Sequence, residues 1–251
     1  MMKRRWAKGS VAVDILSAEG VVSSSILISM VSEDFLIDVG DGTLKLLKGR
    51  DYRFERLHGI FFTHGHYDHI GGLWGLLGYL RFIKRKAPLP IHFPSGSIEL
   101  QEITALHEKL FALDSLFKLH LKEIREGEAI TLGNMNVIPF AARHIGSISG
   151  RSELIPAVGY TIIFKDKDAG DLKIVISGDT GPSRKLMDEV RGADYAIIEA
   201  SFAEDQGILP DTHLSVSQAA RIGKLAREFC LVHLTDQSYP IAFKEGLAPE
   251  D

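Results

Sequence analysis

The sequence has almost no cysteine: Cys230 is the only one in 251 residues. A chain with one thiol can form neither an internal disulfide nor a cysteine-rich zinc module, and a reducing compartment is its natural home. Any metal site must therefore draw mainly on His, Asp and Glu side chains.

The sequence also lacks a long hydrophobic run. The longest apolar-leaning stretch, Val21 to Val31, contains four serines and is much shorter than the roughly 20 residues that cross a bilayer. The basic start, Met1 to Lys8, precedes an apolar stretch that Asp14 and Gly20 interrupt, which does not fit a signal peptide. We expect no membrane partner and a cytoplasmic location.

A strong excess of positive charge is absent as well. Lys and Arg number 29 against 33 Asp and Glu, a formal net charge of −4, so the whole molecule has no electrostatic footprint for nucleic acid. Local basic residues remain as candidate contacts, and we interpret them as solvated or ion-paired surface groups: Lys3, Arg4, Arg5, Lys8, Arg143, Arg151 and Arg184.

What is present predicts one α/β domain over residues 1–251, because apolar residues make up 45% and no linker divides the chain. Short β-branched and aromatic runs predict strands at Val11 to Leu16, Ser25 to Val31, Phe35 to Val39, Gly59 to Thr63, Ile91 to Phe93, His120 to Ile124, Ile130 to Leu132, Met135 to Ala141, Val158 to Phe164, Leu172 to Ser177, Tyr195 to Glu199 and Leu231 to Leu234. Helical spacing predicts helices at Gly72 to Lys84, Ser97 to Leu119, Pro182 to Arg191 and Ser215 to Phe229. Two sheets packed face to face with helices outside satisfy this order.

One compact motif carries the chemistry. The strand Gly59 to Thr63 is followed by His64-Gly65-His66-Tyr67-Asp68-His69. Imidazole and carboxylate are the ligands that zinc or a similar ion accepts when thiolate is missing. His64 and His66 alternate along an extended backbone and so point the same way, while Asp68 and His69 enter the following helix and can serve a second ion.

This motif resembles the signature of the metallo-β-lactamase superfamily of binuclear metallohydrolases, which has a four-layer αββα sandwich fold. The superfamily also places a His, an Asp and a second His at later strand ends, and His144, Asp179 and His233 fit those positions. The resemblance implies that His64, His66 and His144 hold one divalent ion. It implies a second ion on Asp68, His69 and His233, with Asp179 bridging the pair. Zinc is the default, and manganese or iron also suits such a site.

Within the superfamily the sequence is most similar to the ribonuclease Z and phosphodiesterase branch. The similar segments are Phe35 to Thr43, Gly71 to Leu77, Gly178 to Pro182, Ile198 to Phe202 and His213 to Ser215. In that branch an extra His gives a proton to the leaving oxygen, which implies that His213 is a general acid. Glu199 would orient His213, and Asp68 counts as catalytic as well as metal-binding. A capping box, Ser215 with Gln218, predicts a helix start directly after His213.

Two departures from ribonuclease Z affect the expected substrate. Residues 145–178 leave no room for the long arm with which that family clamps tRNA, and Gly146 to Pro156 reads as a Ser- and Gly-rich loop. The Pro-x-Lys-x-Arg-Asn loop of the family is replaced by Val21-Val22-Ser23-Ser24-Ser25. We therefore predict a two-metal phosphodiesterase that acts on a small phosphodiester or RNA.

Three alternatives stay open at this point. The same metals could serve a lactonase, esterase or thioesterase, in which a metal polarises a carbonyl group. A non-catalytic relative could keep the fold as a scaffold or binding module. Finally, two chains could associate as a homodimer.

Overall fold

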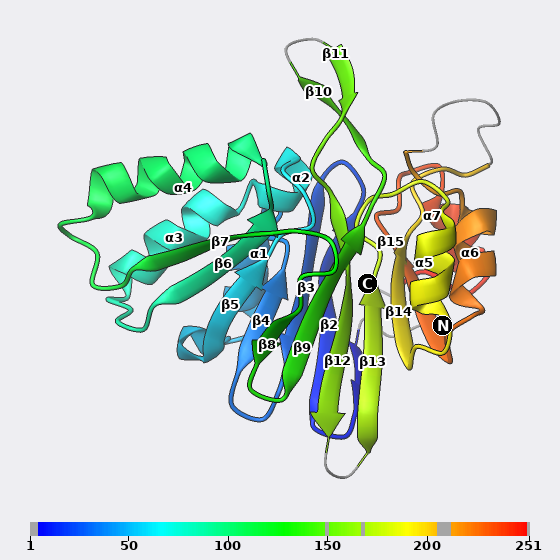
Figure 1. Cartoon of the computed structure of the whole chain (residues 1–251), viewed down its shortest axis with the longest axis horizontal. Coiled ribbons are helices and arrows are strands. Elements are labelled where there is room, and N and C mark those ends of the chain that lie inside the picture. The colour runs from blue at the N-terminus through cyan, green and yellow to red at the C-terminus, as the bar shows by residue number, and fades with distance from the viewer. Residues whose placement is uncertain (1–4, 149–150, 167–168, 205–211, 250–251) are drawn as a thin grey trace.

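The computed structural model describes residues 5–148, 151–166, 169–204 and 212–249. Its first sheet has seven strands in sequence order (Figure 1). The first four strands pair antiparallel and the later ones pair parallel. They are β1 (Arg5–Lys8), β2 (Val11–Glu19), β3 (Ser23–Ser29), β4 (Asp34–Ile37), β5 (Leu57–Phe61), β6 (Leu89–Pro94) and β7 (Leu119–Ile124).

The second sheet has six strands in the order β15-β14-β13-β12-β9-β8. The strands β13, β14 and β15 run parallel, and the others pair antiparallel. Their bounds are β8 (Ile130–Leu132), β9 (Met135–Ala141), β12 (Val158–Asp166), β13 (Gly170–Ile176), β14 (Tyr195–Glu199) and β15 (Glu228–Val232).

Helices cover the outer face of each sheet (Figure 1). The first sheet carries α1 (Thr43–Gly49), a 3₁₀ turn at Phe54–Arg56, α2 (Tyr67–Ile70), α3 (Leu73–Phe82) and α4 (Ile98–Phe111). The second sheet carries α5 (Arg184–Val190), α6 (Val216–Gly223) and α7 (Tyr239–Lys244). The predicted four-layer αββα sandwich is therefore confirmed.

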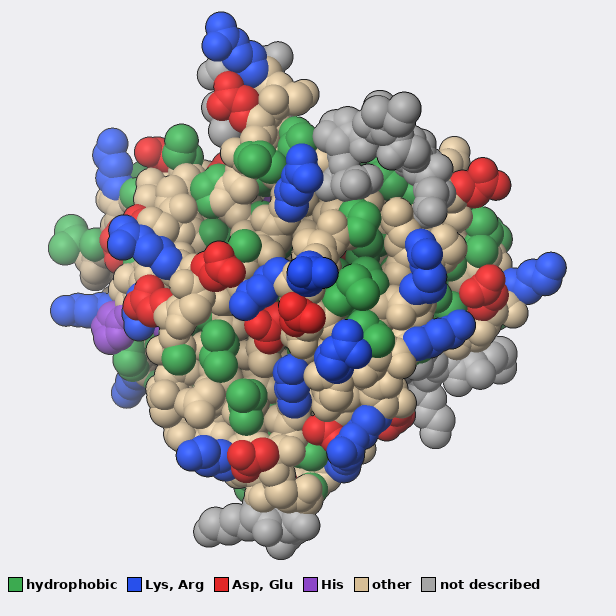
Figure 2. Space-filling view, turned by 45° about the vertical axis from the view of Figure 1, so that its right-hand side comes forward, with side chains coloured by type: hydrophobic (Ala, Val, Ile, Leu, Met, Phe, Trp, Pro, Cys, Tyr) green, Lys and Arg blue, Asp and Glu red, His purple; other side chains and the backbone are tan. Residues whose placement is uncertain are grey.

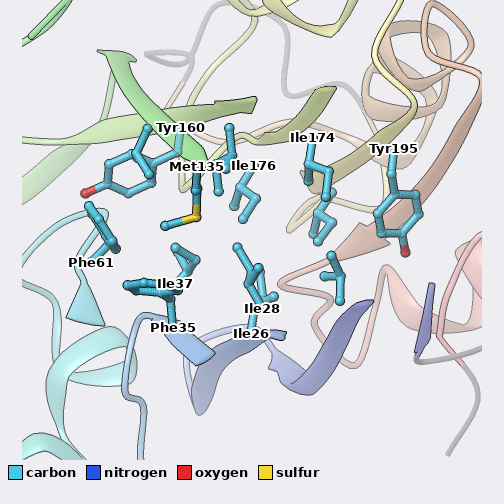
Figure 3. Packing of buried hydrophobic residues seen from close by; sticks show 14 of the residues in the cluster. Ile26, Ile28, Phe35, Ile37, Phe61, Met135, Tyr160, Ile174, Ile176 and Tyr195 are labelled. Atoms are coloured by element: carbon cyan, nitrogen blue, oxygen red, sulfur yellow. The ribbon is translucent and has the colours of Figure 1, made fainter. Parts of the chain in front are cut away.

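Alternating side chains explain how the strands are buried on both faces. On β4, Phe35 and Ile37 face the space between the sheets, whereas Leu36 packs under the helices of the first layer, as the two-residue period of a strand requires. Figure 3 shows the inter-sheet core, where Ile26 and Ile28 from the first sheet meet Ile174 and Ile176 from the second. Because both faces of the sheets are covered, each of these strands contains a consecutive run of buried apolar residues, Ile26–Ile28 in β3 and Ile174–Ile176 in β13.

The structure corrects several sequence-based boundaries. The helix expected over Ser97 to Leu119 ends at Phe111, because Leu119 instead begins β7 beside β6. The helix expected over Ser215 to Phe229 ends at Gly223, because the chain must return as β15 to pair with β14. The predicted capping box at its start is present.

The segment expected to be a loop at Gly146 to Pro156 contains a β-hairpin. Its strands, β10 (Ile145–Ile148) and β11 (Arg151–Leu154), pair only with each other. The hairpin projects beyond both sheets at the top of Figure 1. A short arm therefore does occupy the position between His144 and Asp179.

The basic residues near the start are held by acidic partners. Arg5 pairs with Asp14 at 3.1 Å, and Lys8 pairs with Asp194 at 2.9 Å, in agreement with their interpretation as ion-paired surface groups. The predicted contacts of Lys3 and Arg4 lie outside the described residues. Among the described helices, none combines the length and apolar character needed to span a bilayer.

Candidate metal centre

Four of the predicted site residues lie in the short segment that follows strand β5. The chain stays extended through His66 and then turns into the short helix α2, which carries Asp68 and His69. His64, Asp68 and His69 are buried. The arrangement expected from the motif, with alternating histidines followed by a helix that delivers two more ligands, is the one observed.

The other three predicted ligands come from the second sheet. His144 follows β9, Asp179 follows β13, and His233 follows β15. Because β13, β14 and β15 are parallel, their carboxyl ends lie at one edge of the sheet, where ligand sites of such sheets form. Gly178 makes the turn into Asp179 with φ 59°, and a Cβ there would lie 2.7 Å from the Val158 carbonyl oxygen.

The structure brings all seven side chains together. One group of close ligand atoms is His64, His66 and His144, another is Asp68, His69 and His233, and within each group the atoms lie within 4.8 Å of one another. These are the two sets that the resemblance implied. Asp179 lies between them: its Oδ2 is 3.9 Å from both His64 Nε2 and His144 Nε2 of the first group and 3.2 Å from His233 Nε2 of the second.

We call the seven side chains named above the cage, and two of its buried nitrogens provide a test of whether it fits metal ions. His64 Nε2 and His69 Nε2 have no hydrogen-bond partner among the described residues, although a buried polar atom without a partner costs about 1–3 kcal/mol. Both lie close to the carboxylate of Asp179, His64 Nε2 at 3.9 Å and His69 Nε2 at 3.4 Å. Divalent cations would satisfy these nitrogens, so the donor set fits metal ions.

Burial and neighbouring charges act in different directions on the side chains of the cage. Burial, followed by the adjacent His69, pushes the pKa of His64 well below its usual range, so this ring is neutral. Burial alone would raise the pKa of Asp179, but the imidazoles of His233 and His69 outweigh it and hold that pKa well below its usual range. Neutral imidazole and ionised carboxylate are the forms that bind metals. His69 differs: burial opposes its protonation, but Asp179 and Asp38 outweigh it and raise the pKa of His69 well above its usual range, so this ring must lose its proton when a cation binds.

Asp38 supports the cage from behind, a role that the sequence alone did not reveal. Its carboxylate accepts hydrogen bonds from Thr63 N, Thr63 Oγ1 and His69 Nδ1, each at 2.8 Å. The bond to Nδ1 leaves Nε2 of His69 pointing at the centre, as a carboxylate partner does for many metal-binding histidines. The available signal was the acidic residue that directly follows the buried strand β4.

Glu199 and His213, predicted as catalytic, lie beside the cage. Glu199 Oε1 is 3.1 Å from His213 Nδ1. Ser201 joins them, with its Oγ 3.1 Å from His213 Nδ1 and 2.8 Å from His233 Nδ1. Burial opposes protonation of His213, but the carboxylates of Glu199 and Asp179 outweigh it and raise the pKa of His213 to about 9.

The cage opens into a pocket of about 710 Å³. His66, Asp68, His144, Asp179, His213 and His233 reach its floor, whereas Arg143, Arg151 and Arg184 are exposed and none of them lines it. The pocket therefore gives direct access to the candidate ligands and to His213, with no Lys or Arg among the described residues that line it.

Comparison with known proteins agrees with this geometry. The Beta-lactamase superfamily domain matches residues 34–234. Ribonuclease Z of Archaeoglobus fulgidus is 25% identical over 85% of this chain and 81% of its own length. Ribonuclease Z of Pyrococcus abyssi is 28% identical over 88% of this chain and 82% of its own.

Solved structures share the fold at lower identity. The short form of human tRNase Z has a TM-score of 0.70 and 22% identity, over 90% of this chain and 93% of that one. The metallo-beta-lactamase fold protein YhfI of Bacillus subtilis has a TM-score of 0.69 and 22% identity, over 94% and 92%. With its paired ligand groups at the ends of the strands and this match over most of its length, the chain belongs to the metallo-β-lactamase superfamily, and in sequence it is similar to ribonuclease Z.

Proposed function

We propose that this chain is a metal-dependent hydrolase of phosphodiester bonds that holds two divalent ions. His64, His66 and His144 would hold one ion, Asp68, His69 and His233 the other, and Asp179 would bridge them. The observation that carries this proposal is the convergence of both ligand groups on Asp179, with two orphaned imidazole nitrogens facing it. Zinc suits this set of nitrogen and oxygen ligands, as do manganese and iron.

When bound, such a pair of cations would lower the pKa of a water molecule and stabilise the attacking and leaving oxygens together. The residues of the chain do the rest. Glu199 and Ser201 hold His213 through Nδ1, which leaves Nε2 for the pocket, where it would give a proton to the departing oxygen. Asp68 Oδ2 lies 3.0 Å from His233 Nε2, so two of the proposed ligands of the second ion are already in contact.

The ribonuclease Z relatives support a phosphodiester target over a carbonyl target. The test is elemental analysis of the purified protein, followed by a panel that contains bis(p-nitrophenyl) phosphate, short RNA, a lactone and a thioester. We expect about two metal ions per chain and turnover of the diester.

A pair of matched variants separates the metal centre from general changes in charge. Asp179→Asn removes one negative charge between the ligand groups, and Asp188→Asn removes one from an exposed position on α5. We expect Asp179→Asn to lose metal. Its kcat should fall by more than about 10–100-fold, which is the loss typical when a residue that only supports a ligand is replaced. Asp188→Asn should keep the metal content and the kcat of the parent protein. Turnover of the lactone or thioester without any diester would replace this proposal with carbonyl hydrolysis, and a metal-free protein would support a non-catalytic role.

Two further expectations belong with this proposal. Cytoplasmic location can be tested by fractionating cells that express the full chain. A homodimer can be tested by light scattering during size-exclusion chromatography.

A further inference from the structure

The rim of the pocket carries acidic side chains, whereas the candidate ligands and His213 form its floor. Among the described residues that line the pocket there is no Lys or Arg, and two exposed carboxylates, Glu19 and Asp236, lie on the rim. A substrate with several phosphates would therefore meet negative charge wherever it extends past the reacting group.

The two acidic residues belong to one wall. Glu19 ends β2 and forms an isolated bridge with Leu234, and the next residue, Gly20, donates a backbone hydrogen bond to Leu234 O at 2.9 Å. Asp236 follows Leu234 by two residues in the loop after His233. Both acids also line a neighbouring cavity of about 410 Å³, so this wall is acidic beyond the pocket itself.

Another part of the rim consists of exposed apolar and aromatic side chains. Val21 and Val22, in the turn between β2 and β3, are 56% and 50% exposed, and Tyr67, the first residue of α2, is 65% exposed. Phe202 lines the same pocket and packs its ring against His213. Pockets for small ligands combine such apolar walls with a few fixed polar groups, so this rim suits an aromatic or aliphatic substituent.

The Lys and Arg side chains on one face of the molecule lie among acidic side chains. On the face in Figure 2, Lys and Arg alternate with Asp and Glu and gather into no stripe. Binding of a nucleic-acid strand normally uses several phosphate contacts and depends strongly on salt. A buried pair of ions can attract one phosphoryl group, but nothing among the described rim residues would attract the phosphates that flank it.

Building on the proposed function, we propose that this pocket takes a compact phosphodiester with one negative charge and an aromatic or aliphatic ester group, and that it disfavours RNA. The flanking phosphates of RNA would lie against Glu19 and Asp236. The single charge of a small diester lies over the cage, and its organic group contacts Val21, Val22 and Tyr67.

Two substrates with the same scissile bond test this selectivity. Thymidine 5′-(p-nitrophenyl phosphate) carries one charge, and its 3′-phosphorylated form adds a flanking phosphate. At low salt we expect kcat/KM to be at least about fivefold higher for the singly charged substrate. The gap should narrow as salt is added, because salt screens repulsion between exposed charges.

Matched double variants assign the effect to the acidic wall. Glu19→Gln with Asp236→Asn should bring the ratio of the two kcat/KM values close to one. Glu102→Gln with Asp188→Asn removes the same charge from exposed positions on α4 and α5 and should leave the ratio as in the parent protein.

Calorimetric titration of the metal-loaded protein provides a readout that does not need turnover. Monophenyl phenylphosphonate, with one charge and two aromatic groups, should bind more tightly than thymidine 3′,5′-bisphosphate. Equal or better use of the 3′-phosphorylated ester, of a short RNA or of the bisphosphate would overturn this inference and leave the proposed function standing. If no diester is cleaved but the phosphonate still binds preferentially, the proposed function fails and the selectivity of the pocket stands.

Discussion

Glu199 Oε1 lies 3.1 Å from His213 Nδ1 and also accepts hydrogen bonds from the backbone nitrogens of Leu214 and Thr180. Its Oε2 accepts from Ser201 N and Oγ, each at 3.0 Å. One buried carboxylate thus joins the loop that follows Asp179 to the segment that carries His213. The distance from His213 to the candidate ligands is therefore fixed by hydrogen bonds.

Replacing His213 with Ala should lower kcat for diesters by about 10²–10⁴-fold, because proton donation to the leaving oxygen would be lost. His213 lies outside the proposed ligand set, so metal content should stay that of the parent. Steady-state kinetics with elemental analysis of the same sample checks both. Loss of a metal ion in His213→Ala would instead make this residue a ligand, since it also lies close to His144 and Asp179.

Replacing Asp38 with Asn should weaken metal binding by about 10–100-fold while leaving every proposed ligand in place. An amide cannot accept from Thr63 and His69 through both of its terminal atoms, so the tautomer of His69 would no longer be fixed. Competition with a chelator of known affinity measures the change. Unaltered affinity in Asp38→Asn would limit the role of this residue to stabilising the backbone.

Removal of metal by a chelator should lower the thermal midpoint. An ion present at 100 times its dissociation constant stabilises the folded chain by about 2.7 kcal/mol, which is about 5–10 °C for a domain of this size. Differential scanning fluorimetry with and without chelator, followed by re-addition of zinc, measures the effect and its reversal. Asp179→Asn supplies the control, because its midpoint should respond less to the chelator.

Replacing His92 with Phe should make the fold less sensitive to acid. His92 stacks on Phe61 at 4.5 Å, and neither of its ring nitrogens has a hydrogen-bond partner among the described residues. Burial, with Lys122 nearby, lowers the pKa of His92 to about 4. The unfolded chain, in which this pKa is near 6.5, then binds more protons between pH 6.5 and 4, so stability falls as the pH drops through this range.

Protonation of His92 in the unfolded chain lowers the free energy of unfolding by about 2–3 kcal/mol between neutral pH and pH 4. Urea unfolding of chelator-treated protein at pH 7 and pH 4.5 measures it without a contribution from metal release. His92→Phe should lose less stability than the parent between these pH values. His120→Gln, an exposed histidine on β7, should behave like the parent, and equal losses in all three proteins would contradict the assignment.

The sequence was most informative where several metal-ligating side chains lie within a few residues of one another. Three imidazoles and a carboxylate in the motif from His64 to His69 identified four of the seven proposed ligands, and the resemblance then added His144, Asp179 and His233. The strand β12 and the capped start of α6 were also predictable, because an apolar run and a capping box act within a few residues.

What the sequence did not reveal depends on contacts between distant residues. Asp38 reads as part of an ordinary acidic turn until β4 and β5 place it against His69. Ser201 is one serine among many until β14 and β15 bring it to His233. The hairpin of β10 and β11 was missed because Gly and Ser residues conceal strands whose only partners are each other.

The division of the proposed ligands between two sheets has a consequence for how the molecule stays folded. His64, His66, Asp68 and His69 follow β5 in the first sheet, and the remaining three follow strands of the second. An ion on the second ligand group would link Asp68 and His69 to His233, and Asp68 and His233 are 165 residues apart in the chain. It would stabilise the fold because it binds only the native arrangement of the two sheets. A protein whose only thiol is Cys230 cannot form an internal disulfide. The metal would give it a reversible cross-link between its two sheets, which depends on the metal concentration around the protein.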